Sequence, residues 1–64
     1  MFSEFERVKI KETGITGVIV DITTINGEIC ITVESDEKGV PGGSGDEDSW
    51  KLFDCKEGDL EKIR

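Results

Sequence analysis

Alternating apolar and charged residues near the start of the chain predict β-strands. Residues 7–11 read Arg-Val-Lys-Ile-Lys, the pattern of a strand with one buried face. A second apolar run follows at 17–22. Gly14 lies between the two runs, and Gly17, three residues later, begins the second one. This spacing indicates a tight turn or bulge, where the backbone needs a positive φ or a close approach.

The dipeptide Asn26-Gly27 predicts a hairpin between the second strand and a third one. A type I′ turn needs positive φ at both central residues, and asparagine and glycine tolerate this best. With these two residues as the loop, Ile22 faces Ile31 and Val20 faces Val33 on the core side. A slip of one residue would turn the apolar set to the other face. The turn chemistry and the apolar pattern therefore select the same register.

The segment 35–49 differs from the strands in composition. It holds four glycines and one proline, its only sizeable apolar residue is Val40, and it closes on Asp46-Glu47-Asp48. Such a segment cannot bury enough apolar surface to offset the entropy lost on ordering. We therefore expect a flexible, acidic, glycine-rich loop at 35–49.

Together these patterns predict an all-β fold of about five antiparallel strands in a single domain, 1–64. The third strand covers 28–34, strand character returns at 50–53, and the spacing of Leu60 and Ile63 indicates one 3₁₀ or helical turn near the C-terminus. We expect a closed barrel, because closure removes the exposed edges of a small sheet. The predicted core is Phe5, Val8, Ile10, Ile15, Val18, Val20, Ile22, Ile29, Ile31, Val33, Trp50, Leu52, Leu60 and Ile63.

Charge narrows the class of partner. The 64 residues include 15 acids and 8 bases, for a net charge of −7. Affinity for nucleic-acid phosphates comes from lysine and arginine, so this balance argues against a nucleic-acid partner and permits one with a basic face. The N-terminus lacks the pattern of a signal peptide, and no segment approaches the ~18 apolar residues of a membrane helix. We expect a cytoplasmic protein with no membrane contact.

Few catalytic or metal-binding arrangements are available to this chain. It has no histidine and two cysteines, Cys30 and Cys55, so it lacks a Ser-His or Cys-His pair and the four ligands of a structural zinc. The two thiols are expected to be free and reduced. The run Asp46-Glu47-Asp48 lacks the alternating spacing and the twelfth-position glutamate of a calcium loop. We expect no enzyme activity, no metal site and no cofactor.

Six residues are candidates for contact with a protein partner. Ile19 and Phe53 have the strand parity opposite to the core set, so we expect them on the outer face as an apolar patch for a partner or a second copy. Trp50 shares its parity with Leu52 and fits either the core or an interface anchor, since tryptophan is enriched at interface hot spots. The run Asp46-Glu47-Asp48 would lie at the rim, where exposed acids speed association.

The segment 8–22, with its Gly14-Ile15-Thr16-Gly17-Val18 motif, resembles the strand–glycine–strand opening of KOW-type, SH3-like barrels. Over most of 5–63 the chain looks like short, largely uncharacterised bacterial proteins of that fold, whose C-terminal Asp-Leu turn would be Asp59-Leu60. The resemblance implies a small SH3-like barrel.

Two functions follow as expectations. The first is a non-enzymatic protein-binding module for a partner with a basic surface, such as a bacterial inhibitor or immunity-type protein. Since KOW domains often bind RNA or ribosomal and transcription proteins, the resemblance implies the alternative of a nucleic-acid- or ribosome-associated domain that uses Arg7, Lys9 and Lys11. A homodimer remains open in either case.

Overall fold

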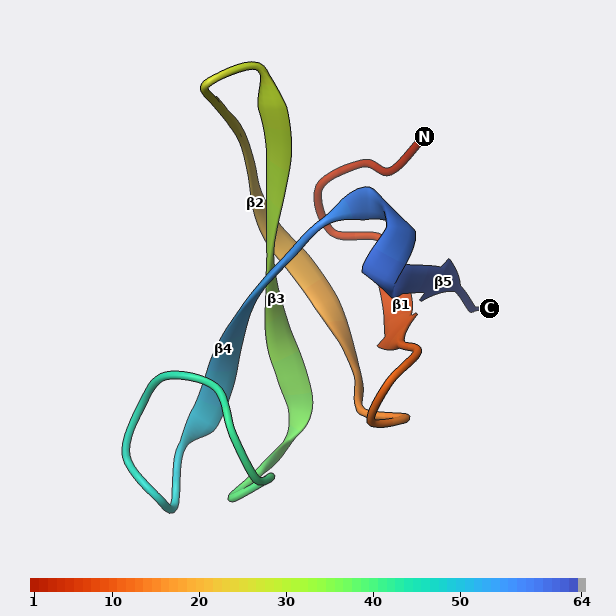
Figure 1. The fold of residues 1–64 in the computed structure, drawn as a ribbon. Helices are drawn as coiled ribbons and strands as arrows, with labels where there is room; N and C mark the ends of the chain where they lie inside the picture. The colour runs from red at the N-terminus through yellow and green to blue at the C-terminus, as the bar shows by residue number, and fades with distance from the viewer. Residues whose placement is uncertain (64) are drawn as a thin grey trace.

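A computed structural model describes residues 1–63 as one curved antiparallel sheet (Figure 1). Its elements are β1 (Arg7–Ile10), β2 (Thr16–Ile25), β3 (Glu28–Lys38), β4 (Trp50–Cys55), the 3₁₀ turn η1 (Glu57–Asp59) and β5 (Leu60–Lys62). The strand order is β4-β3-β2-β1-β5. The predicted all-β class, the five antiparallel strands and the turn near the C-terminus are confirmed. No helix within 1–63 has the length and apolarity needed to cross a bilayer.

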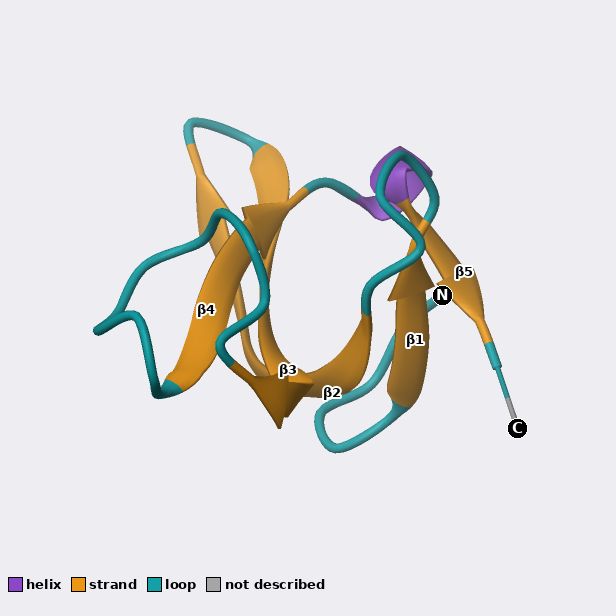
Figure 2. Cartoon of the chain, turned by 90° about the horizontal axis from the view of Figure 1, so that it is seen from below, coloured by secondary structure: helices purple, strands orange, loops and turns teal. Residues whose placement is uncertain are grey.

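The sheet curls around a common interior without closing (Figure 2). β4 pairs with β3 and β5 pairs with β1, and within the described residues β4 and β5 do not pair with each other. The expectation of a closed barrel is therefore wrong. The loop before β4 covers part of the open edge instead: Ser44 and Leu52 exchange two backbone hydrogen bonds of 2.8 and 3.0 Å. Pairing of this kind shields an edge that would otherwise be open to another strand.

The hairpin turn has the predicted chemistry. Asn26 has a φ of 52° and Gly27 a φ of 81°, as a type I′ turn requires. From the turn to Asp21 the pairing follows the predicted register, with Ile22 opposite Ile31. The prediction for this half of the hairpin is confirmed.

The predicted register ends at Val20. β2 bulges between Ile19 and Asp21, so Val33 pairs with Ile19 instead of Val20. Because one extra residue reverses which side of the sheet the preceding residues face, Ile19 turns inward. Its side chain has 0% exposure, whereas Val20 is partly buried. The expectation that Ile19 lies on the outer face is wrong.

The core consists of seven buried apolar residues: Val8, Ile10, Ile19, Ile31, Val33, Cys55 and Leu60. Five of these were in the predicted core. Four predicted core residues are exposed instead: Phe5, Ile29, Trp50 and Leu52. Ile29 pairs with Thr24 near the β2–β3 turn, and this end of the hairpin projects beyond the rest of the sheet in Figure 1.

Gly14 and Gly17 are required for two different reasons. Gly14 has a φ of 78°, which a residue with a side chain rarely adopts. Gly17 lies where β2 comes close to β3. A Cβ there would overlap the carbonyl oxygen of Glu34 and lie 2.8 Å from Cγ1 of Val33. The sequence spacing indicated that the backbone needs a positive φ or a close approach here, and the structure shows the first at Gly14 and the second at Gly17.

The acidic loop is shorter than the predicted 35–49, because β3 continues to Lys38. Its backbone lies against β4: a Cβ on Gly43 would be 2.9 Å from Cζ of Phe53. The amide of Gly39 also donates to the carbonyl of Ser49 at 3.0 Å. Glycine here permits a close approach to the aromatic ring and the strand. The mobility of the loop stays a prediction.

Candidate protein-binding surface

The inner side of β4 differs from the sequence expectation. Phe53 pairs with buried Val33 and Cys55 pairs with buried Ile31, so both side chains face the interior. Phe53 is partly buried and packs against the core. The expectation of an outward Phe53 is wrong, and the predicted patch of Ile19 and Phe53 does not exist.

The outer side of β4 exposes two large apolar side chains. Trp50 is 51% exposed and Leu52 is 40% exposed. For Trp50 the sequence left the core and the surface open, and the structure places it at the surface. Lys51, between them, is buried. Its aliphatic stem lies beneath the glycine-rich loop, since a Cβ added to Gly45 would be 3.7 Å from Cδ of Lys51. A lysine stem can be buried in this way while its ammonium group reaches water.

A buried serine holds β3 and β4 together next to this surface. Glu34 pairs with Leu52 and Lys38 with Trp50, so three residues of β3 lie opposite Lys51 alone. The Oγ of Ser35 accepts a hydrogen bond from the backbone amide of Lys51 at 2.9 Å. The same hydroxyl donates to the carbonyl of Glu37 at 2.7 Å. Ser35 is only 3% exposed, and its side chain supplies the hydrogen bonds that the irregular pairing removes.

The outer face surrounds these apolar residues with acids. Leu52 lies opposite Glu34, and Asp54 lies opposite Thr32 and hydrogen-bonds to it at 3.2 Å. On β2, Val18 lies opposite Glu34 and Asp21 lies opposite Thr32, so both belong to the same outer face. We call this surface the outer patch; its members are Val18, Trp50, Leu52, Asp21, Glu34 and Asp54.

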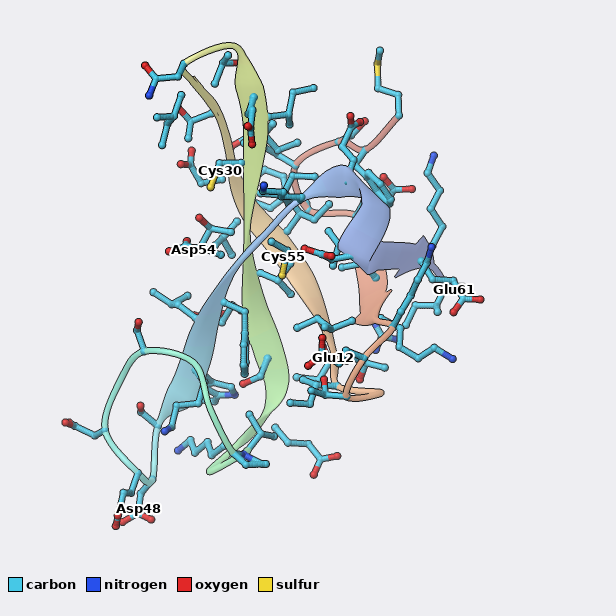
Figure 3. All side chains as sticks on the ribbon, in the orientation of Figure 1. Glu12, Cys30, Asp48, Asp54, Cys55 and Glu61 are labelled. Atoms are coloured by element: carbon cyan, nitrogen blue, oxygen red, sulfur yellow. The ribbon has the colours of Figure 1, made fainter. Side chains whose placement is uncertain are left out.

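The remaining candidates lie at one end of the outer patch. Asp46, Glu47 and Asp48 are all exposed and directly precede β4. Figure 3 shows Asp48 at the end of the molecule where β4 begins. The ammonium of Lys38 lies 4.3 Å from the centroid of the Trp50 ring, a cation–π contact. Trp50 and the acidic run lie at the same end of β4, and Leu52 and Lys38, which the sequence did not assign to the site, lie beside Trp50.

The basic residues of β1 are largely neutralised. The Arg7 guanidinium forms an ion pair with Asp36, and the Lys9 ammonium lies 3.4 Å from a carboxylate oxygen of Glu61. Of the three residues named for a nucleic-acid role, only Lys11 has no ion pair within 1–63. Both ion pairs place a carboxylate beside a basic side chain of β1.

A groove of about 460 Å³ opens between β4 and the β1–β2 turn. Its apolar lining includes Ile10, Phe53 and Cys55, and Glu12 lies at the turn (Figure 3). Burial, followed by the nearby Asp59 and Asp54 carboxylates, raises the pKa of the Cys55 thiol. A thiol with a raised pKa stays protonated and is a poor nucleophile.

Both cysteines are free, and Cys30 is only partly buried. Within 1–63, no three Cys, His, Asp or Glu side chains come close enough together to hold a metal ion.

Comparison with protein-family models, curated proteins and solved structures gives no match for this chain. The resemblance to KOW-type barrels therefore stays a prediction.

Proposed function

We propose that this domain is a non-enzymatic protein-binding module whose outer patch contacts a partner with a basic surface. The observation that carries the proposal is the exposure of Trp50 and Leu52 side by side on the outer face of β4. Buried aromatic and aliphatic anchors supply most of the energy of a protein interface, and tryptophan is the most enriched among them. The partner would bury both side chains in an apolar depression.

The charge around the anchors supports a basic partner. Asp21, Glu34 and Asp54 lie on the outer patch, and the run Asp46-Glu47-Asp48 lies at its end. Complementary charge speeds the encounter of two proteins and rejects acidic competitors. A bacterial inhibitor or immunity-type protein, which occupies the basic site of another protein, would use a surface of this kind.

The alternative is a KOW-like nucleic-acid domain, and the ion pairs of Arg7 and Lys9 weigh against it. A phosphate-binding surface gains affinity by releasing counterions, which a domain of net charge −7 does poorly. We expect no tight binding of RNA or duplex DNA at physiological salt. A dissociation constant on the order of 10⁻⁶ M or below that weakens steeply with salt would favour the alternative.

The test compares capture by matched variants. Tagged wild-type protein, Trp50→Ala and Ile25→Ser are used to capture partners from the native cell, and the bound proteins are quantified by mass spectrometry. Ile25 is a suitable control because it is 57% exposed and lies at the hairpin turn, away from the outer patch. We expect a basic protein that binds wild type and Ile25→Ser but is lost with Trp50→Ala.

The affinity of the purified partner then gives the magnitude. Trp50→Ala should weaken binding by more than ~1 kcal/mol, whereas Ile25→Ser should leave the affinity unchanged. Equal loss in both variants, or none in either, would show that the outer patch is not the binding surface. A circular dichroism spectrum of each variant establishes that it is folded.

The acidic run has a different expected effect. Replacing Asp46, Glu47 and Asp48 with Asn, Gln and Asn should slow association and reduce its dependence on salt, with little change in the dissociation rate. Stopped-flow measurements at several salt concentrations separate the two rates. A change confined to the dissociation rate would place these residues in the buried contact instead of the rim.

A further inference from the structure

Within residues 1–63 two lysine ammonium groups lie over aromatic rings: Lys62 is 5.5 Å from the Phe2 centroid, and Lys38 lies closer to Trp50. Lys38 is the only basic residue between Glu34 and Asp48, a segment that also carries six acids. Its ammonium forms no ion pair with any of residues 1–63; it lies 4.3 Å from the Trp50 ring centroid. The two residues are direct partners in the β3–β4 pairing, which places the lysine next to the indole. The free domain therefore already shows a cation bound at the largest exposed aromatic side chain of the outer patch.

We propose that the Trp50 indole is a recognition site for an arginine side chain of the partner, and that Lys38 occupies this site in the unbound domain. The inference rests on the proposed function and deepens it by naming the chemistry of one contact. Tryptophan is the best aromatic acceptor for a cation. Arginine is favoured over lysine as the incoming group, because its planar guanidinium stacks on a ring and is less strongly hydrated than an ammonium.

The surroundings of the ring favour an incoming cation. Glu34 lies on the same face next to Leu52, and Asp48 precedes Trp50 by two residues. Carboxylates near a cation site attract a guanidinium, and a charge-assisted hydrogen bond to a carboxylate is stronger than a neutral one. Leu52 is exposed beside the ring and can pack against the aliphatic stem of the arginine.

Lys38 is a competitor that a partner can displace. It lies at the exposed end of β3, and an exposed cation–π contact is weak. When an arginine side chain stacks on the indole, the lysine ammonium returns to water at a small cost in free energy. Removal of Lys38 should therefore strengthen arginine binding, which is the opposite of what a structural role for the contact implies.

The experiment uses the single tryptophan of the chain as the reporter. The full-length domain, labelled with ¹⁵N, gives one indole N–H resonance, and weak binding can be followed by its shift. The probes are the peptide acetyl-Gly-Arg-Gly-Arg-Gly-amide and the same peptide with citrulline in place of arginine. Citrulline keeps the shape and removes the charge. At 0.15 M salt we expect a saturable shift of the Trp50 indole with the arginine peptide and none with citrulline.

Variants of the competing cation give the sharper test. Lys38→Ala should tighten binding of the arginine peptide about two- to five-fold, the factor that corresponds to ~0.5–1 kcal/mol for an exposed cation–π contact. Lys56→Ala is the matched control: it removes the same charge from a side chain that pairs with Glu28, and binding should not change. Lys38→Arg should bind no more tightly than wild type. Equal shifts by both peptides, weaker binding in Lys38→Ala, or equal tightening in Lys38→Ala and Lys56→Ala would overturn the inference.

The peptide and capture experiments fail in different ways. If partner capture depends on Trp50 while the arginine and citrulline peptides behave alike, the arginine site is wrong and the protein-binding function stands. If the arginine peptide binds as expected but no captured protein depends on Trp50, the proposed function fails and the partner arginine inferred from it fails as well.

Discussion

Replacement of Ser35 by alanine tests how the sheet holds β4 in place. The Ser35 hydroxyl joins two backbone groups beside the irregular β3–β4 pairing, the amide of Lys51 and the carbonyl of Glu37. Alanine fits the same space and removes both hydrogen bonds. The amide of Lys51 then loses its acceptor in a buried position.

The size of the effect follows from burial. An unsatisfied buried donor costs about 1–3 kcal/mol. The hydrogen bond to Glu37 is only partly buried, so water can replace the hydroxyl there and the loss is at the low end of ~0.5–1.5 kcal/mol. We therefore expect Ser35→Ala to lower the free energy of unfolding by about 1.5–3.5 kcal/mol. A domain of this size has about 3–10 kcal/mol of stability in total, so the loss should be large in relative terms.

Urea denaturation followed by circular dichroism measures this loss. Ser49→Ala is the matched control, because its hydroxyl donates to the carbonyl of Asp46 at 2.8 Å in the exposed loop and should contribute little. Hydrogen exchange of the Lys51 amide should also accelerate in Ser35→Ala. A free energy of unfolding for Ser35→Ala within ~0.5 kcal/mol of the wild-type value, with the Lys51 amide still protected from exchange, would refute the reasoning.

Two further substitutions probe backbone crowding and the buried thiol. Gly17→Ala should lower the free energy of unfolding by about 1–3 kcal/mol, because its Cβ would overlap β3. The control is Gly58→Ala, whose Cβ meets no atom within 4 Å and which should be neutral or slightly stabilising. Equal urea midpoints for the two variants would contradict this expectation. Folding raises the pKa of Cys55, so its contribution to stability is complete below the unfolded pKa of about 8.5 and is lost as the pH rises through the folded value. In a Cys30→Ser background, melting temperatures from pH 7 to pH 10 should fall more than in the same background with Cys55→Ala, and parallel curves would contradict the shift.

Local sequence signals predicted those parts of the fold that depend on a few neighbouring residues. The Asn26-Gly27 turn needs positive φ at two adjacent positions, and few residue types other than asparagine and glycine supply it. The register near the turn follows from the turn itself, so Ile22 was matched correctly to Ile31. The spacing of Gly14 and Gly17 likewise indicated a positive φ or a close approach, and the tertiary structure decided which glycine has which role.

The candidate surface depended on relations between distant residues, and there the sequence was ambiguous. One bulged residue at Val20 reverses the side of the sheet for all of β2 before it, and nothing in the apolar run marks that position. This reversal placed Ile19 in the core instead of in the patch. The sequence pattern identified Ile19 correctly as a strand residue, but it assigned the side chain to the outer face of the sheet instead of the inner one.

The same ambiguity applies to β4. Trp50 and Leu52 occupy one side of the strand and Phe53 and Cys55 the other, so alternation alone fits either orientation. Residues distant in sequence determine the orientation of β4, because Phe53 pairs with Val33 and lies against the glycine-rich loop. The sequence by itself determined the strands, the tight turn and the acidic character of the domain, since these depend on composition and local backbone preference. Only the packing of the sheet against its loop decided which aromatic side chain is left for a partner, because burial of a strand face is a property of the whole fold.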